Sequence, residues 1–229
     1  MTRLLRILLA FLLLTAAGSA AHAQEETYKF DLGAGAGISG YLGDVNQANV
    51  YRNPGFAAQL GFRYLFDTRW ALRGTLTTAG LRGDSSQFSN KFPGSGEPFK
   101  FTSQIWELDC RGEVNFFPYG IGETFKRLKR WTPYLAVGVG VCLSTSGGKT
   151  YVAPAIPLAF GLKFKLMPRL NLAAEFSMTK VFGDHVDGAL SDLQGIKSDF
   201  VKNTDWHSNI LLSITYEFGK RCSTCHYQK

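Results

Sequence analysis

The chain of 229 residues lacks an apolar run long enough for a membrane-spanning helix once its first 23 residues are set aside. Such a helix needs about 20 consecutive apolar residues. If the mature chain crosses a membrane, it must therefore cross with strands. These strands must close into a barrel, because lipid offers no hydrogen-bond partners to the edge of an open sheet.

Histidine is also scarce, with 4 residues in the whole chain, and no group of residues has the spacing of a metal site. Asp184 and His185, with Asp187 and Ser191, allow a hydrolase in the last loop, but such loop residues are usually only solvated. We expect no catalytic residue, no metal and no cofactor. The net charge of +7 is compatible with nucleic-acid binding. The chain, however, has no basic helix and no nucleic-acid-binding motif that would support this function.

The N-terminal segment has the organisation of a secretory signal peptide. Arg3 and Arg6 precede an apolar run over Ile7–Ala17, and Ala21–Ala23 supplies a small-x-small cleavage pattern. We expect cleavage after Ala23, with an uncleaved anchor as the alternative. The predicted organisation is a signal peptide (1–23), one outer-membrane barrel domain (24–218) and a C-terminal tail (219–229).

The segment Ile105–Phe117 alternates between two kinds of side chain with the period of a β-strand. Trp106 and Leu108 fall on an apolar face, whereas Glu107 and Asp109 fall on a charged one. Two such faces are compatible in an outer-membrane barrel, which has lipid on one side and a polar lumen on the other. Seven further segments alternate in the same way: 28–39, 56–64, 70–76, 135–143, 156–166, 170–178 and 206–218.

The sequence therefore predicts an all-β fold, an eight-stranded antiparallel transmembrane β-barrel with a polar, side-chain-filled lumen. A soluble lipocalin-like barrel is the alternative, but its apolar side chains would face inward. An eight-stranded barrel has little room beyond its own side chains, so luminal charges must pair. The predicted charge network sets Lys29, Arg63, Arg73, Arg111, Lys163 and Lys165 against Asp31, Glu107, Asp109, Glu113, Glu175 and Glu217.

The connections alternate between short and long, as they do in such barrels. Phe66–Arg69 and Met167–Arg169 are expected to be tight periplasmic turns, so that both termini lie in the periplasm. The longer outer loops are expected at 39–53, 78–100, 143–151 and 181–204. The turn Pro118–Thr132 is an exception, because it is long and basic. It is either a solvated turn or a docking surface for a periplasmic partner, with Lys126, Arg127, Lys129 and Arg130 as the candidate contacts.

Two short motifs have competing interpretations. Gly35–Gly40 matches the G-x-G-x-x-G of nucleotide-binding folds, yet it lies within a predicted strand, where small residues relieve crowding in a narrow barrel. Cys222–His226 matches the haem-attachment motif, but it ends three residues before the terminus. In an oxidising periplasm, Cys222 and Cys225 pair with each other or with a partner protein.

Cys110 and Cys142 are expected on neighbouring strands but on opposite faces. Their positions differ in parity, so Cys110 should face lipid and Cys142 the lumen. The sequence therefore predicts that these two cysteines do not form a disulfide.

The order of several motifs resembles one family. The run Trp106–Tyr119, then Pro133–Leu135 opening a glycine-rich strand, is similar to the PorG-like outer-membrane proteins of the type IX secretion system. Tyr41–Asp44, Arg69–Gly74 and Asp205–Trp206 fit the same pattern. The resemblance covers 28–218 and excludes the tail.

The resemblance implies a non-enzymatic part of a protein-export and gliding machine in the outer membrane of a gram-negative bacterium. Such proteins tether a periplasmic ring, built from a lipoprotein and its partner, to the membrane. Lipid and the ring are then the partners, with no nucleic acid and no small-molecule substrate. The alternative is a small OmpA-like barrel with an adhesive or envelope-stabilising role.

Overall fold

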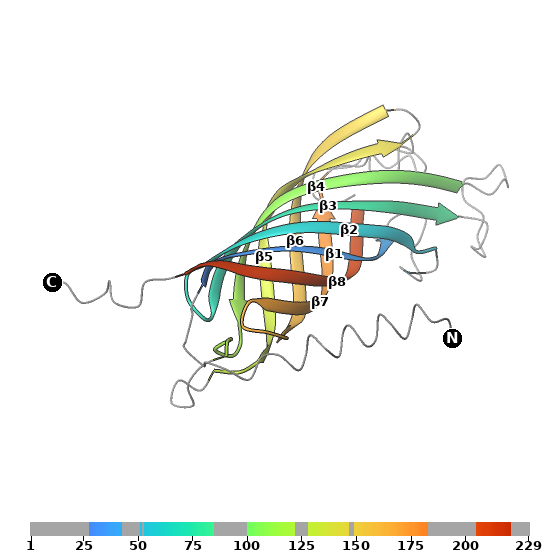
Figure 1. Ribbon diagram of the computed structural model, residues 1–229. Helices are drawn as coiled ribbons and strands as arrows, with labels where there is room; N and C mark the ends of the chain where they lie inside the picture. The colour runs from blue at the N-terminus through green and yellow to red at the C-terminus, as the bar shows by residue number, and fades with distance from the viewer. Residues whose placement is uncertain are drawn as a thin grey trace, which may run out of the picture.

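The computed structural model describes residues 28–42, 51, 53–84, 100–121, 128–146, 149–182 and 205–220. Eight antiparallel strands form a closed barrel in sequence order, and β8 pairs back with β1 (Figure 1). The strands are β1 (Tyr28–Leu42), β2 (Gly55–Leu65), β3 (Trp70–Asp84), β4 (Lys100–Asn115), β5 (Trp131–Ser146), β6 (Lys149–Lys165), β7 (Leu170–Val181) and β8 (Asp205–Lys220). The predicted fold class and strand number are confirmed. The described residues contain no helix suited to crossing a membrane.

The two faces of each strand differ as the alternation predicted. On β5, for example, Val137 and Val139 are exposed by 52% and 67%, whereas Tyr134 and Ala136 are fully buried. Burying so many charges while exposing so many apolar side chains is unfavourable in water. A surrounding lipid phase removes the cost of the exposed apolar side chains, and pairing within the lumen offsets that of the buried charges, so the outer surface is a membrane-facing one. This arrangement rules out the soluble lipocalin-like alternative.

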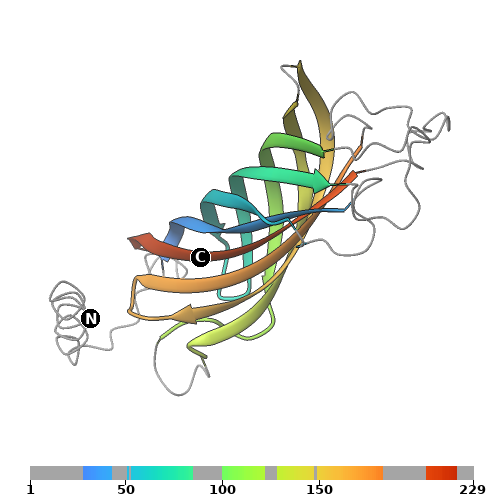
Figure 2. The same cartoon turned by 90° about the vertical axis from the view of Figure 1, so that its right-hand side faces the viewer.

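The strands are tilted against the barrel axis and differ in height (Figure 2). The β6–β7 ladder ends at the pair Ala155–Val181, while β5 and β6 remain paired as far as Ser146 and Lys149. The predicted long loop at 143–151 is therefore wrong, because only 147–148 separate the two strands. A two-residue Gly-Gly connection is typical of a β-hairpin.

The barrel closes where β1 meets β8, and glycine is required at that seam. A Cβ atom on Gly37 would lie 1.8 Å from the backbone oxygen of Ile210, and one on Gly33 would lie 2.3 Å from Thr215 Cγ2. All residues of the G-x-G-x-x-G motif lie within β1, so they do not form the strand-to-helix turn that a nucleotide site needs. The small residues instead allow the two strands to approach.

The two cysteines of the barrel lie where their parity predicted. Cys110 is exposed on the lipid face, Cys142 is buried in the lumen, and no disulfide joins them. In the β4–β5 register, Cys110 pairs with Val139 and Cys142 with Glu107. The prediction that they do not form a disulfide is confirmed.

Candidate functional site

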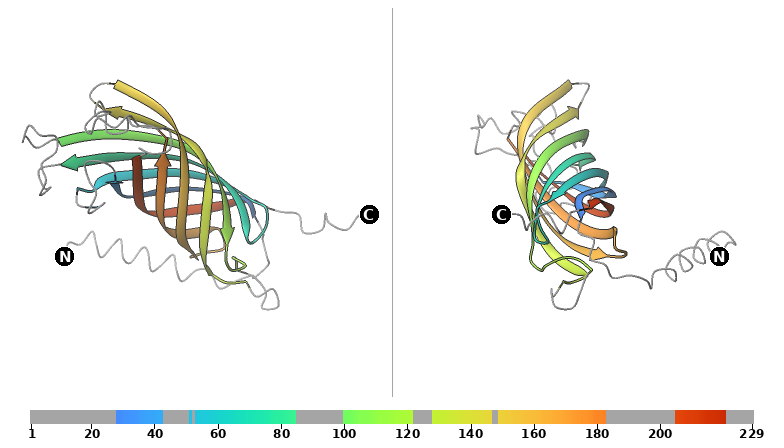
Figure 3. Two further views of the ribbon diagram at one scale, coloured as in Figure 1. Left: turned by 180° about the vertical axis from the view of Figure 1, so that it is seen from behind. Right: turned by 60° about the vertical axis from the view of Figure 1, so that its left-hand side comes forward.

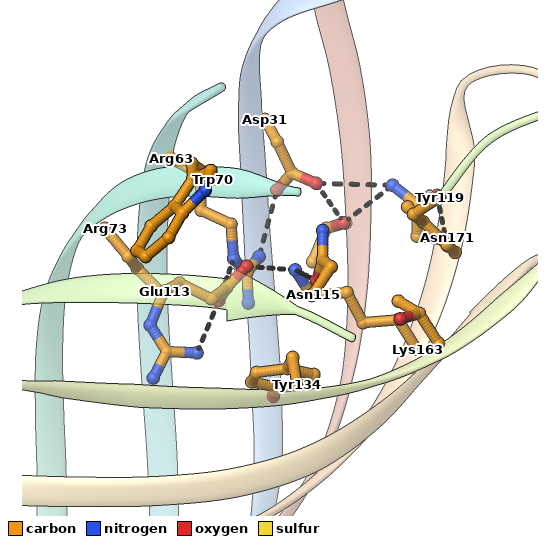
Figure 4. Close-up of polar contacts among 12 residues, drawn as sticks. Asp31, Arg63, Trp70, Arg73, Glu113, Asn115, Tyr119, Tyr134, Lys163 and Asn171 are labelled. Carbon is orange, nitrogen blue, oxygen red and sulfur yellow. Dashed lines mark hydrogen bonds and ion pairs between the residues drawn. The ribbon is translucent and has the colours of Figure 1, made fainter. Parts of the chain in front are cut away.

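The lumen at the turn end of the barrel is filled by paired charges, and Glu113 on β4 is at their centre (Figure 4). Arg63 Nε lies 3.1 Å from Glu113 Oε2, Arg73 Nη1 lies 3.6 Å from the same oxygen, and Lys163 Nζ contacts Oε1. Arg63 also reaches Asp31, with 3.1 Å between Nη1 and Oδ1. One carboxylate thus holds cations from three different strands.

A second centre forms around Glu175 on β7. Arg73 on β3 donates two hydrogen bonds to its carboxylate, one of them 3.1 Å long, and the Tyr134 hydroxyl donates another. Arg111 Nη1 lies 3.5 Å from Glu175 Oε1. Because β3 and β7 are opposite strands of an eight-membered ring, the Arg73–Glu175 pair spans the whole lumen.

Further along the lumen, Arg111 bridges the charges of its own strand. Its Nη2 lies 2.6 Å from Asp109 Oδ2 and 3.4 Å from Glu107 Oε1. Glu107 also accepts a hydrogen bond of 3.3 Å from Thr179 on β7 and lies 2.8 Å from His207 Nε2 on β8. His207 is not among the residues of the charge network predicted from the sequence.

The structure places the members of the predicted luminal network inside the barrel, except for Lys29. All the other predicted members are buried, with at most 6% of their surface exposed. Lys29 has the parity of a luminal residue, but it is the second residue of β1, at the edge of the barrel, and is exposed. Among the described residues, the buried charges of the network are therefore five cations and six carboxylates, and His207 is a further buried basic side chain.

The lumen changes character toward the loop end, which the sequence analysis did not foresee. A buried apolar layer replaces the charges there, comprising Tyr41, Ala57, Ala79, Leu81, Ile105, Cys142, Ala155, Val181 and Leu211. Between the seam glycines and Arg73 is a void of about 10 Å³, which is room for roughly one water molecule. This void is too small to pass a solute.

The predicted basic turn is partly built into the barrel. The Tyr119 hydroxyl donates a hydrogen bond of 2.8 Å to Asn171 Oδ1, and the Tyr119 amide donates one of 3.2 Å to the oxygen of Thr68. A backbone bridge between Tyr119 and Lys129 holds the two arms of the connection together. Burial raises the pKa of the Tyr119 phenol. The connection therefore covers the turn end of the lumen.

Several predicted site residues lie outside the described part of the chain. Lys129 and Arg130 are described and exposed, with Lys129 Nζ 3.8 Å from the ring centroid of Phe117. The predicted residues that are not covered include the signal peptide, Lys126, Arg127, Asp184, His185, Asp187, Ser191, Cys222 and Cys225. No group of three or more His, Cys, Asp or Glu side chains is arranged for a metal ion within the described residues.

Residues 3–227 match the family model described as "Domain of unknown function (DUF6089)". No curated protein matches the chain. Among solved structures, Neisserial surface protein A is similar, with a TM-score of 0.54 and 13% identity over 82% of this chain and 97% of that one.

Two further structures have lower scores. A major outer-membrane protein of Thermus thermophilus has a TM-score of 0.48 and 16% identity, over 84% of this chain and all of that one. The attachment invasion locus protein Ail of Yersinia pestis, in complex with the heparin analogue sucrose octasulfate, has 0.48 and 13%, over 83% and 99%. At these identities the likeness to Neisserial surface protein A shows a shared barrel fold and no shared activity.

Proposed function

This chain belongs to the DUF6089 family, and we propose that it serves as a non-enzymatic anchor in the outer membrane, docking a periplasmic ring of the type IX secretion system that contains a lipoprotein. The observation that carries the proposal is the basic connection between β4 and β5, which is fixed beneath a plugged barrel. The motif order described above supplies the identity of the machine, and the barrel fold supplies the membrane location.

The filled lumen supports an anchoring role over a transport role. Opening a path would require separating pairs such as Arg73–Glu175, and a buried ion pair that loses one partner costs about 3–5 kcal/mol. The apolar layer around Leu81 and Ile105 closes the other half. The surfaces available for function are therefore the two ends of the barrel.

The turn end is the better candidate for docking. Both chain ends of the barrel, Tyr28 and Lys220, pair with each other there, and short turns at this end are the periplasmic arrangement of outer-membrane barrels. The connection 116–130 is anchored through Tyr119, and we propose that its central residues contact the partner. Lys126 and Arg127 are among the central residues of this connection. Cys222 and Cys225 belong to the tail, which follows the end of β8 at the same end of the barrel.

Recovery of partners from solubilised membranes tests the proposal. A tagged full-length chain is expected to recover the lipoprotein and its ring partner. Lys126→Gln/Arg127→Gln and a chain ending at Phe218 are expected to weaken this recovery by tenfold or more, whereas Arg82→Gln, at the exposed loop end of β3, should not. Failure of the wild-type chain to recover either ring protein refutes the docking role.

A non-reducing gel addresses the cysteines of the tail. An intermolecular bond gives a larger species that collapses on reduction and disappears in Cys222→Ser or Cys225→Ser. An internal Cys222–Cys225 bond leaves the size unchanged and only blocks labelling by a thiol reagent.

The second candidate function is that of a small OmpA-like barrel with an adhesive or envelope-stabilising role. Features of the loop end of the barrel favour it. There the outward face of the sheet becomes polar, since Thr102, Gln104 and Thr145 are exposed and Gln104 Nε2 donates to Thr78 Oγ1 at 2.7 Å. A polar sheet continuing past the apolar belt presents a surface outside the membrane. Loss of cell adhesion without loss of secretion in a deletion strain would favour this role.

A further inference from the structure

Among the described residues, the exposed charges at the turn end are strongly unbalanced. Five cationic side chains of the described residues are exposed there: Lys29, Arg69, Lys129, Arg130 and Arg169. We name this set the basic rim. The exposed carboxylate of the described residues at the same end is Asp67, and it accepts hydrogen bonds from the backbone amides of Arg69 and Trp70 at 2.6 and 2.7 Å. No ion pair within the described residues neutralises Lys29, Arg69, Lys129 or Arg130.

The basic rim lies at the level of a belt of aromatic side chains. Lys129 Nζ lies 3.8 Å from the ring centroid of Phe117 and 5.8 Å from that of Trp131. Arg169 donates hydrogen bonds to the hydroxyls of Tyr28, at 2.9 Å, and Tyr216, at 3.2 Å. Amphipathic rings of this kind are enriched at the boundary between hydrocarbon and headgroups. The cations are therefore placed where lipid phosphates lie.

The basic rim is also distributed around the whole barrel. Arg69 lies in the β2–β3 turn, Lys129 and Arg130 in the β4–β5 connection, Arg169 in the β6–β7 turn, and Lys29 at the start of β1. These segments gather at one end of the barrel (Figure 3). A protein partner would contact one sector of this circle, whereas lipid surrounds all of it. The distribution therefore favours headgroups.

We propose that the basic rim binds anionic phospholipid headgroups, such as phosphatidylglycerol, in the leaflet at the turn end. Each guanidinium or ammonium group pairs with a phosphate at the depth set by its neighbouring ring. This role goes beyond the docking function and does not depend on it. It fixes the depth and tilt of the barrel, and with them the position of the connection 116–130.

Brominated lipids test the proposal, because bromine on an acyl chain quenches a nearby indole. The four tryptophans divide between the two ends, with Trp70 and Trp131 beside the basic rim and Trp106 and Trp206 at the loop end. A Trp106→Phe/Trp206→Phe chain therefore reports on the rim alone, and a Trp70→Phe/Trp131→Phe chain reports on the opposite end.

The full-length chains are reconstituted in vesicles of phosphatidylcholine and phosphatidylglycerol, with either lipid brominated in turn. At the rim, phosphatidylglycerol is expected to be favoured roughly fivefold over phosphatidylcholine, and raised salt should reduce this ratio. The loop end should show a ratio near one. Replacing Arg69, Lys129, Arg130 and Arg169 with Gln should abolish the preference, whereas Arg82→Gln should leave it unchanged.

Equal quenching by the two lipids at the rim overturns the proposal. So does a preference that survives the four rim substitutions. If those substitutions instead abolish recovery of the ring proteins while the lipid preference is unchanged, the rim is a protein-binding surface. Loss of the lipid preference with normal recovery of the ring supports lipid binding and leaves the docking function intact.

Discussion

His207 on β8 contacts Glu107 on β4 across the lumen, with 2.8 Å between Nε2 and Oε2. The two strands stand opposite each other in the eight-stranded ring, so this single contact joins the two walls of the barrel. On β4, Glu107 lies two residues from Ile105 of the apolar layer and two residues from Asp109 of the charge network. The pair therefore lies where the charged and apolar parts of the lumen meet.

Replacing His207 with Leu is expected to destabilise the barrel by about 1–3 kcal/mol, because a buried acceptor on Glu107 loses its partner. The double variant His207→Leu/Glu107→Gln should recover part of this loss, since it also removes the negative charge. Urea unfolding of the refolded barrel in micelles, followed by tryptophan fluorescence, gives the free energy of unfolding of each variant. Strictly additive effects would show that the two side chains do not interact.

Glu113 is expected to be the most sensitive position of the charge network. Glu113→Gln leaves three buried cations without their shared carboxylate, and breaking a buried pair in this way costs about 3–5 kcal/mol. Adding Lys163→Met removes one of the cations that has lost its carboxylate partner, and should restore a measurable part of the stability. The same unfolding measurement compares the two variants, and an unchanged midpoint for Glu113→Gln contradicts the arrangement.

The strands and their faces could be predicted from the sequence because the alternation of side chains depends only on neighbouring residues of the same strand. Cys110 and Cys142 followed their positions in the alternation, and so did the buried charges. The prediction for Lys29 was wrong because parity gives the face of a strand but not the position along the barrel axis. The Lys29 side chain lies at the end of the barrel, where it is exposed. His207 was missed because its partner lies on the opposite wall, four strands away in the ring.

The connections were harder to predict than the strands. The loop expected at 143–151 is a hairpin, and the Gly-Gly pair at 147–148 was the available signal. The role of Tyr119 had no comparable signal, because its contact with Asn171 joins segments that are distant in the sequence. The apolar layer likewise depends on which strand ends meet at one height.

Gly37→Ala is expected to prevent normal closure of the barrel. Its Cβ would meet backbone of β8 at 1.8 Å, and backbone cannot move aside as a flexible side chain can. Gly61→Ala is the matched control, since nothing lies within 4 Å of the Cβ it would add. The heat-modifiable gel shift of the folded barrel should be lost or weakened in the first variant and kept in the second.

Thiol labelling is expected to separate the two barrel cysteines in a Cys222→Ser/Cys225→Ser background. Cys110 faces lipid, so a membrane-permeant maleimide should react with it while a charged, impermeant one should not. Cys142 should react only after unfolding, because it is buried in the apolar layer. Labelling of Cys142 in the folded barrel would contradict the register of β5.

Tyr119→Phe is expected to loosen the connection 116–130 without unfolding the barrel. The change removes the hydroxyl that donates to Asn171, a hydrogen bond worth about 1 kcal/mol, while the ring can still pack beneath Lys165. Opening should then be roughly five times more frequent, and trypsin should cut after Lys126 or Arg127 at a correspondingly higher rate. Tyr64→Phe, on the lipid face, is the control and should leave this rate unchanged. Equal cleavage of wild type and Tyr119→Phe would mean that the hydroxyl does not anchor the connection, and the docking surface would then lose its fixed position beneath the barrel.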